Sequence, residues 1–238
     1  MTNRTDEASP LVYARVAGVA YLVITIAAVL YGILVESKLV VPGNDAATAG
    51  NIIANESLFR VGIVLVLSIY VSVVVLSWAL YVILKTVDKN LALLALLFRA
   101  GEAIVGAATV LISFTMLFVL GGNGPASAFE AAQLQALAGR FLDVRTAGLD
   151  IVLIFIGLGA TVFCYLFFKS KYIPRTLAAW GIFTYLSMLF LGLVSILFPS
   201  HPLMLELVLY SVGALFEFVI GLWLLIKGID IQQLEDQE

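Results

Sequence analysis

Three ionisable residues lie inside long apolar runs of the sequence, where a charge is costly. Arg99 and Glu102 belong to the run at residues 91–120, and Glu217 belongs to the run at residues 203–226. Ionisable groups inside hydrocarbon usually face neighbouring helices or a water-filled cavity, and they often bind ions, protons or substrates. These three residues are therefore the first candidates for chemistry in the chain.

The depth of the three residues can be counted from the lysines that flank the two runs. Lys89 precedes the first run and Lys227 follows the second. At about 1.5 Å per helical residue, Arg99 and Glu217 each lie about 15 Å from the same edge, and Glu102 lies about one turn deeper. Arg99 and Glu102 also share one helix face, because they are three residues apart. We expect all three to form one buried cluster.

Such a cluster holds two carboxylates for one guanidinium. Either a further cation balances the second carboxylate, or one glutamate carries a proton. Both solutions suit a site that binds a ligand or an ion, or that couples to protons. Two alternatives remain open: the cluster only fixes the register of the helices, as buried polar contacts do in membranes, or it takes part in catalysis.

A second polar group is predicted at the opposite edge of the bundle. Arg60, Arg145, Asp150 and Glu206 stand where apolar runs begin. Arginine side chains at such places reach the lipid headgroups. Aspartate and glutamate side chains are shorter, so each carboxylate needs a nearby partner. We expect one of the two arginines to pair with one of the two carboxylates, which closes the mouth of the bundle or, as the alternative, captures a ligand.

The residues that familiar enzymes and metal centres need are scarce. The chain has one cysteine, Cys164, and one histidine, His201, which lies in a turn at residues 199–202. These are too few for an internal disulfide or for a zinc, iron–sulfur or bis-histidine haem centre. The sequence also has no phosphate-binding glycine loop or helical metal-binding pair, and its deep acids are glutamates rather than paired aspartates. No cofactor, metal or catalytic residue is predicted.

The composition indicates the solvent in which these residues are placed. Of the 238 residues, 62% are hydrophobic and 12% are charged. A soluble domain is about half apolar and a quarter charged. The formal net charge of −3 offers no basic face to nucleic acid. The sequence therefore predicts a single transmembrane domain over residues 1–238 with short connections.

Six runs are long enough to cross a membrane, since a spanning helix needs about 20 mainly apolar residues. Backbone amides in lipid must bond internally, and these runs lack the alternation of a barrel, so helices are predicted. The first run ends at Glu36 without a small-residue cleavage site, so it is treated as a permanent span. The predicted fold is an all-α integral membrane protein, a six-transmembrane helical bundle, with spans at residues 16–35, 61–84, 91–120, 149–168, 177–198 and 203–226.

Basic residues are distributed unequally between the two sides of this bundle. The side that holds both termini has twice as many as the other, so the positive-inside rule predicts cytoplasmic termini. The predicted location is the plasma (inner) membrane of a bacterium, as a multi-pass protein. The cytoplasmic set is Arg4, Arg15, Lys85, Lys89, Lys169, Lys171, Arg175 and Lys227, and the opposite set is Lys38, Arg60, Arg140 and Arg145.

The two longer connections, at residues 45–59 and 126–145, are predicted to form interfacial helices. In the first, Ile52 and Phe59 lie among polar residues, a mixture typical of the headgroup boundary. Ordinary loop helices packed over the mouth of the bundle are the alternative. Turn signals at residues 42–43 and 121–125 mark the ends of the first and third spans.

Short motifs spread along nearly the whole chain carry a family resemblance. They are Tyr-Ile-Pro-Arg at residues 172–175, Asn-Glu at 55–56 with Phe-Arg at 59–60, Arg99 with Glu102, and Leu-Trp-Leu-Leu-Ile-Lys-Gly at 222–228. Together they resemble an uncharacterised bacterial family of multi-span membrane proteins, domain of unknown function 4386. The resemblance implies a bacterial membrane protein of several spans and carries over no activity.

The biochemical function is not disclosed by these features, and three alternatives follow from them. The first is a bundle that binds or translocates a small molecule, lipid or proton through Arg99, Glu102 and Glu217. The second is a structural or regulatory membrane subunit, and the third, least favoured, is an intramembrane enzyme. The predicted partners are membrane lipids and a small-molecule ligand or proton; a homo-oligomer stays open, and nucleic acid is not expected.

Overall fold

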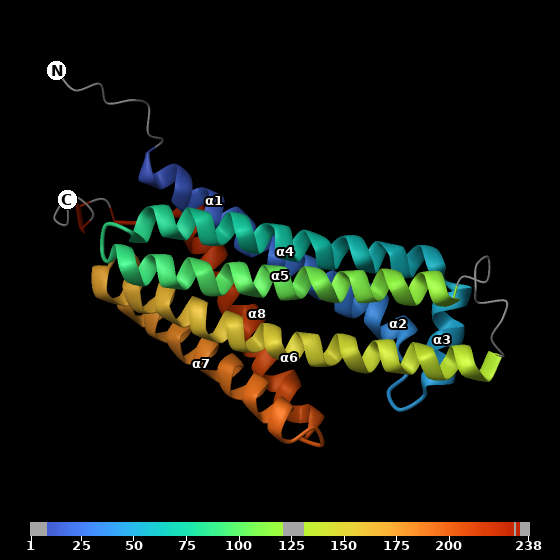
Figure 1. Cartoon of the computed structure of the whole chain (residues 1–238). Helices are drawn as coiled ribbons and strands as arrows, with labels where there is room; N and C mark the ends of the chain where they lie inside the picture. The colour runs from blue at the N-terminus through green and yellow to red at the C-terminus, as the bar shows by residue number, and fades with distance from the viewer. Residues whose placement is uncertain (1–8, 121–130, 231, 234–238) are drawn as a thin grey trace.

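The chain forms a bundle of long helices (Figure 1). The computed structural model describes residues 9–120, 131–230 and 232–233, and over these ranges its regular elements are all helices. In chain order they are α1 (Pro10–Leu30), the π-helix η1 (Tyr31–Glu36), α2 (Ser37–Leu39), α3 (Asp45–Ala54), α4 (Glu56–Leu84), α5 (Lys89–Leu120), α6 (Ala131–Ser170), α7 (Arg175–Leu197) and α8 (Leu203–Ile226).

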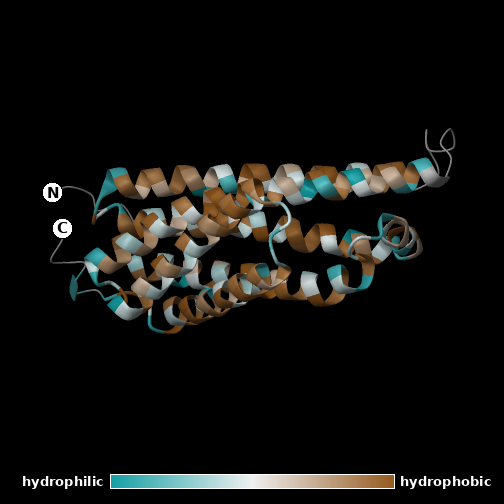
Figure 2. Ribbon diagram, turned by 90° about the horizontal axis from the view of Figure 1, so that it is seen from below, coloured by the Kyte–Doolittle hydropathy of each residue, from teal (hydrophilic) through white to brown (hydrophobic). Residues whose placement is uncertain are grey.

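Six of these helical segments are long and apolar enough to cross a membrane, which confirms the predicted six-span, all-α fold. The first of them joins α1, η1 and α2 into one rod, Pro10–Leu39. Every predicted span lies within one helical segment, apart from Phe198, which caps the end of α7. Hydrophobic residues cover most of the length of the helices, and hydrophilic residues lie mainly toward the two ends of the bundle (Figure 2). Hydrocarbon is the solvent that such a surface needs.

The six spanning helices pack in chain order and close into a ring. Each of α1, α4, α5, α6 and α7 packs against the next, and α8 returns to pack against α1. Figure 1 shows α4, α5 and α6 side by side, with α7 along α6. The first and last spans are therefore neighbours, and both α1 and α8 have one end at the same end of the bundle. We call this the termini end.

Two large hydrophobic cores lie one after the other along the bundle, and a third, small one is formed by Leu153 of α6 with Met188 and Leu191 of α7. The core toward the termini end takes buried side chains from all six spanning helices, including Tyr21, Leu80, Phe163, Tyr185 and Phe216. The core toward the far end takes them from η1, α2, α3, α4, α5 and α6, without α7 and α8. Burial inside the bundle is decided by packing, because lipid is as apolar as the side chains that face it.

The helix α6 is longer than the bilayer requires. It has 40 residues and so is about 60 Å long, whereas α7 and α8 have 23 and 24 residues and are about 35 Å long. The hydrocarbon layer is about 30 Å thick. The ring is therefore complete only toward the termini end, and α4, α5 and α6 continue beyond the turn between α7 and α8 (Figure 1).

This length corrects the prediction for residues 126–145. Residues 131–145 are the first turns of α6, so they do not form a separate interfacial helix. Over residues 45–59 a short helix does form, but it ends at Ala54, and Asn55 separates it from α4. The short helix α3 packs across α6, which matches the alternative of a loop helix over the bundle mouth. The predicted turn at residues 121–125, residues 126–130 and Arg4 lie outside the described residues.

Local hydrogen bonds fix the turns at the termini end. Asp88 caps α5, because its carboxylate accepts hydrogen bonds from the backbone amides of Asn90 and Leu91 at 3.1 and 3.0 Å. Lys171 follows the end of α6 with a φ of 61°, in the left-handed region. Pro174 is the residue before the first turn of α7. Proline disfavours a helical conformation in the residue that precedes it, so α7 does not extend further toward the N-terminus. These turns hold α5 and α7 in antiparallel contact with their neighbours.

Candidate functional site

Arg99 and Glu102 form a buried ion pair on α5. The Arg99 Nη1 and Glu102 Oε2 atoms are 2.6 Å apart, and the two side chains are 2% and 3% exposed. The helix α6 presses closely on the arginine, since a Cβ added to Gly159 would lie 3.0 Å from Arg99 Cγ. Glycine at this position lets the two helices approach, and the guanidinium is then covered by protein rather than by lipid.

The pair is not fully satisfied within the part of the chain that the structure describes. Arg99 Nη1 and Glu102 Oε2 touch without the geometry of a hydrogen bond, and neither atom has another hydrogen-bond partner there. The buried hydroxyl of Thr184 on α7 also lacks a partner among these residues. Buried polar groups are nearly always hydrogen-bonded in folded proteins, so this layer is the candidate site of the bundle.

Glu217 on α8 joins the same polar layer through hydroxyl groups. The Tyr185 hydroxyl of α7 donates a hydrogen bond to Glu217 Oε1 at 3.1 Å, and Thr25 of α1 also interacts with the carboxylate. Arg99 attracts Glu217 electrostatically, but among the described residues no cation comes within 4.0 Å of this carboxylate. The three residues predicted as one cluster are thus brought together, with a direct ion pair only inside α5.

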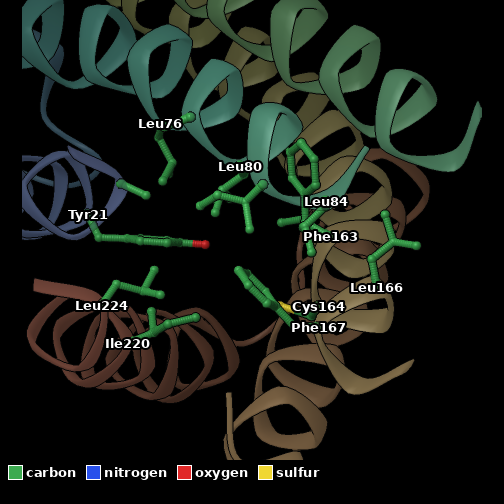
Figure 3. Close-up of a cluster of buried hydrophobic side chains, with 14 of the residues drawn as sticks. Tyr21, Leu76, Leu80, Leu84, Phe163, Cys164, Leu166, Phe167, Ile220 and Leu224 are labelled. Carbon is green, nitrogen blue, oxygen red and sulfur yellow. The ribbon is translucent and has the colours of Figure 1, made fainter. Parts of the chain in front are cut away.

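Two tyrosines complete the layer and were missed by the sequence reasoning. Tyr21 of α1 and Tyr185 of α7 are 2% and 1% exposed, and their side chains interact with each other. Figure 3 shows the Tyr21 hydroxyl pointing inward among Leu80, Cys164 and other core side chains. A tyrosine in the middle of an apolar span is a usable signal, because its hydroxyl needs a polar partner when it is buried.

Aromatic contacts hold the tyrosine that bonds Glu217. Tyr185 stands edge to face against Phe216, with ring centroids 5.6 Å apart, and Trp180 packs against the same phenylalanine at 5.5 Å. Phe216 is fully buried and directly precedes Glu217. Packing of this kind restricts the rotamer of Tyr185, so the position of its hydroxyl is set by α7 and α8 together.

The four residues predicted as an external polar cluster are not brought into one cluster. Arg60 pairs with Glu56 one turn before it on α4 at 2.8 Å, and both side chains are about half exposed. Arg145 on α6 donates a hydrogen bond to the Tyr31 hydroxyl at 2.7 Å and lies over the same ring. The expected pairing of either arginine with Asp150 or Glu206 is therefore wrong. Arg60 pairs within its own helix, and Arg145 bonds the tyrosine of η1.

Asp150 and Glu206 instead meet at the turn between α7 and α8. Glu206 Oε1 lies 2.8 Å from His201 Nε2, and Asp150 interacts with Ser195. The Ser195 hydroxyl also approaches His201 Nε2, at 3.5 Å. The sequence places His201 in a turn, but a hydropathy pattern does not show that this turn folds the imidazole back onto α8.

The atoms of this group do not match a serine–histidine–acid catalytic triad. In a triad the nucleophile and the acid occupy opposite nitrogens of the imidazole ring. Here Ser195 and Glu206 both approach Nε2, and Nδ1 lies 3.1 Å from the Phe198 carbonyl oxygen. Over the described residues, no group of three or more His, Cys, Asp and Glu side chains is placed to hold a metal ion.

A ring of six apolar helices around a buried arginine–glutamate layer defines a multi-pass helical membrane protein. The chain belongs to the family described as Domain of unknown function (DUF4386), whose profile matches residues 16–228. This confirms the family that the sequence motifs resemble, and the family description indicates no biochemical function. No curated protein and no solved structure matches the chain.

Proposed function

We propose that this protein binds a proton at the Arg99, Glu102 and Glu217 layer and couples that proton to the binding or translocation of a small molecule or lipid. The observation that carries the proposal is the charge balance of the layer. One guanidinium faces two carboxylates, and only Glu102 is in direct contact with it. An uncompensated carboxylate inside the bilayer costs several kcal/mol, so the second one takes up a proton or a cation.

Glu217 is the carboxylate of the layer that takes up the proton. Its partners are hydroxyl groups of Tyr185 and Thr25, which can bond either a carboxylate or a carboxylic acid. Glu217 is also only partly buried, whereas Arg99 and Glu102 are buried. Protonation of Glu217 also leaves the ion pair on α5 intact, because Glu102 and not Glu217 is in direct contact with Arg99.

The hydroxyl groups link the proton site to three helices. Tyr21 on α1, Tyr185 on α7 and Glu217 on α8 come from both sides of the seam where the ring closes. A change in the charge of Glu217 alters the hydrogen bond to α7 and the interaction with α1 at once. Such a link is what coupling requires, since a proton shifts a conformational equilibrium only if it bonds differently in the two states.

A structural or regulatory subunit is the second candidate. The observation in its favour is that the ion pair is sealed, with 2% and 3% exposure. Against it, Arg99 and Glu102 lie on the same helix, so their ion pair does not tie one helix to another. The proposed proton site explains both the hydroxyl partners of Glu217 and its lack of a cation.

The test is proton uptake by the protein reconstituted in lipid. Infrared difference spectra between acidic and alkaline buffer are expected to show the carbonyl bands of the exposed carboxylic acids and a separate band from a buried one, and Glu217→Gln is expected to remove the band of the buried acid. Liposomes with an imposed pH gradient and a pH-sensitive dye then report whether protons also cross. The matched control is Glu56→Gln, because Glu56 is an exposed glutamate whose partner Arg60 is also exposed.

Two results would reject the proposal. One is a Glu217→Gln difference spectrum that keeps the buried-acid band of the wild type. The other is a wild-type spectrum that shows only the bands of exposed carboxylic acids, which would leave the subunit role as the better account. Size-exclusion profiles of each variant show whether the bundle is still folded.

The proposal also includes the membrane in which the protein resides and its orientation there. The plasma membrane of a bacterium, with both termini cytoplasmic, is supported by the excess of basic residues at the termini end. Among the described residues that end carries Arg15, Lys85, Lys89, Lys169, Lys171, Arg175 and Lys227, and the far end carries Lys38, Arg60, Arg140 and Arg145.

A further inference from the structure

A cavity of about 560 Å³ opens at the termini end, away from the polar layer. It lies between the turn that joins α6 to α7 and the residues that follow α8. The two segments are fastened together by a hydrogen bond from the Asp230 amide to the Tyr172 carbonyl oxygen, at 3.0 Å. The cavity is lined by Lys171, Tyr172, Ile173, Pro174, Arg175, Trp223, Lys227, Gly228, Ile229 and Asp230.

The charge of this cavity is positive. Lys171, Arg175 and Lys227 line it, and within the described residues none of them forms an ion pair. Asp230 is the one carboxylate among the described residues of the lining, and its Oδ1 accepts hydrogen bonds from the backbone amides of Gln232 and Gln233, at 3.0 and 3.4 Å. The lining therefore has three cations against one carboxylate that is already engaged.

The backbone of the cavity also favours an anion. Helix α7 begins at Arg175, and no side chain from the described part of the chain caps its first amides. The free amides and the helix dipole at such an end attract phosphate and carboxylate groups. The amides add to the three side-chain cations, so backbone and side chains favour the same kind of ligand.

Lys171 holds its place at a conformational cost. Its φ of 61° lies in the left-handed region, where glycine is the usual residue after a helix end. Any residue with a Cβ is disfavoured there, and lysine has no short polar group that would relieve the strain. Strain that persists at one residue of a cavity lining suggests a use for its side chain.

We propose that this cavity binds the phosphate group of an anionic phospholipid from the adjacent membrane leaflet. The cavity lies at the end of the spanning helices, where headgroups are found, and Trp223 in its lining is the amphipathic residue typical of that interface. Basic pockets between spanning helices at the cytoplasmic face bind such headgroups. A soluble phosphate compound shares this chemistry, and the experiment separates the two sources.

The experiment measures binding to the purified full-length protein in a neutral detergent. The probes are dioctanoyl phosphatidylglycerol, dioctanoyl phosphatidylcholine and inorganic phosphate, and the signal is tryptophan fluorescence with a parallel thermal unfolding curve. Phosphatidylglycerol is expected to change the fluorescence and to raise the unfolding midpoint. Trp223→Phe is expected to abolish the fluorescence change and to retain the stabilisation, because Trp78 and Trp180 lie outside the cavity lining.

Removal of single charges tests the residues. Arg175→Gln and Lys227→Gln are each expected to weaken phosphatidylglycerol binding about fivefold, since one basic residue near a charged headgroup contributes about 1 kcal/mol. The matched control is Lys85→Gln with Lys89→Gln, two lysines at the same end of the bundle that do not line the cavity. This control is expected to bind as the wild type does.

Lys171→Gly separates loss of binding from loss of folding. Glycine relieves the left-handed conformation, so thermal stability is expected to stay equal or to rise. Phosphatidylglycerol binding is expected to fall about fivefold in the same variant, because the cation is gone. An effect in opposite directions on stability and binding cannot come from unfolding.

Three outcomes would overturn the proposal. Equal weakening in the Lys85 and Lys89 control would show that only general surface charge attracts the lipid. Equal binding of phosphatidylcholine would show that the anionic charge is not recognised. Binding of inorganic phosphate at the same concentration as phosphatidylglycerol would assign the cavity to a soluble phosphate compound rather than to a lipid.

Discussion

The buried ion pair of α5 contributes little net stability itself, but the loss of one of its two partners would be strongly destabilising. A salt bridge inside a protein often contributes little net stability, because both partners lose their hydration. Removal of one partner, however, leaves the other charge buried and alone. Arg99 and Glu102 are 2% and 3% exposed, so neither charge could reach water by a change of rotamer.

Arg99→Gln is expected to destabilise the folded protein by about 3 to 5 kcal/mol, because the Glu102 carboxylate then lacks its cation. The double variant Arg99→Gln, Glu102→Gln is expected to recover most of this loss, since both charges are removed together. The measurement is the free energy of unfolding in mixed detergent micelles. A double variant no more stable than Arg99→Gln alone would contradict the ion-pair account.

The chain offers a matched control on α4. Arg60 and Glu56 form a similar arginine–glutamate pair one turn apart, but their side chains are 51% and 47% exposed. Exposed pairs contribute at most about 1 kcal/mol, because water and salt screen them. Arg60→Gln is therefore expected to change stability much less than Arg99→Gln does.

At the scale of the elements, the closure of the ring depends on the contact between the first and last spans. Gly18 of α1 faces Gly221 and Leu225 of α8 so closely that an added Cβ would lie 2.8 Å from the Gly221 carbonyl oxygen and 2.5 Å from the Leu225 amide nitrogen. Both of these atoms belong to the backbone, so they cannot move aside without moving the helix. Small residues at such crossings let helices pack in a membrane.

Gly18→Ala is expected to destabilise the bundle by about 1 to 3 kcal/mol, because α1 and α8 must separate to admit the methyl group. The measurement is thermal or denaturant unfolding in detergent. Gly50→Ala is the control, since a Cβ at this exposed position of α3 has nothing within 4 Å and alanine favours the helix by about 1 kcal/mol. Equal stability of the two variants would contradict a close α1–α8 crossing.

The Gly18→Ala substitution also bears on the polar layer. Tyr21 and Thr25 on α1 follow Gly18 on the same helix and interact with groups on α7 and α8. Separation of α1 from α8 would draw these hydroxyls away from Glu217. The position of the proposed proton site is therefore set by a helix crossing whose two members are about 200 residues apart in the chain.

At the scale of the whole molecule, the two ends of the bundle differ. The termini end is a closed six-helix ring, whereas the far end consists of η1, α2, α3 and the extended parts of α4, α5 and α6 around a separate core. The helix α6 is about twice as long as the hydrocarbon is thick, so part of it stands outside the bilayer. The direction in which this part projects decides which compartment it meets.

Cysteine labelling in intact bacterial cells measures that direction. The background is Cys164→Ala, since the native cysteine is buried. A membrane-impermeant maleimide added outside is expected to label Glu56→Cys and to leave Lys85→Cys unlabelled until the cells are opened. These two positions are exposed and lie at opposite ends of α4. The reverse pattern of labelling would place the termini outside and reject the positive-inside assignment.

The sequence alone determined the number of spans, their helical state and the depth of the ionisable residues. These properties are local, because about 20 apolar residues in hydrocarbon must satisfy their backbone within one helix, and residues are spaced evenly along its axis. Arg99 and Glu102 could be paired on the same ground, since they are neighbours on one helix face. The family of the chain could likewise be inferred, because the motifs that carry the resemblance are short stretches of consecutive or nearby residues.

Only the tertiary structure decided which groups meet across helices. Tyr185 for Glu217 and Tyr31 for Arg145 are partners that no spacing along the chain predicts. Such contacts depend on the rotation and tilt of each helix about its neighbours, and these are set by close crossings such as that of Gly18 with α8. In hydrocarbon an apolar helix face has nearly the same solvation free energy against lipid as against protein, so hydropathy does not indicate which face of a helix turns inward.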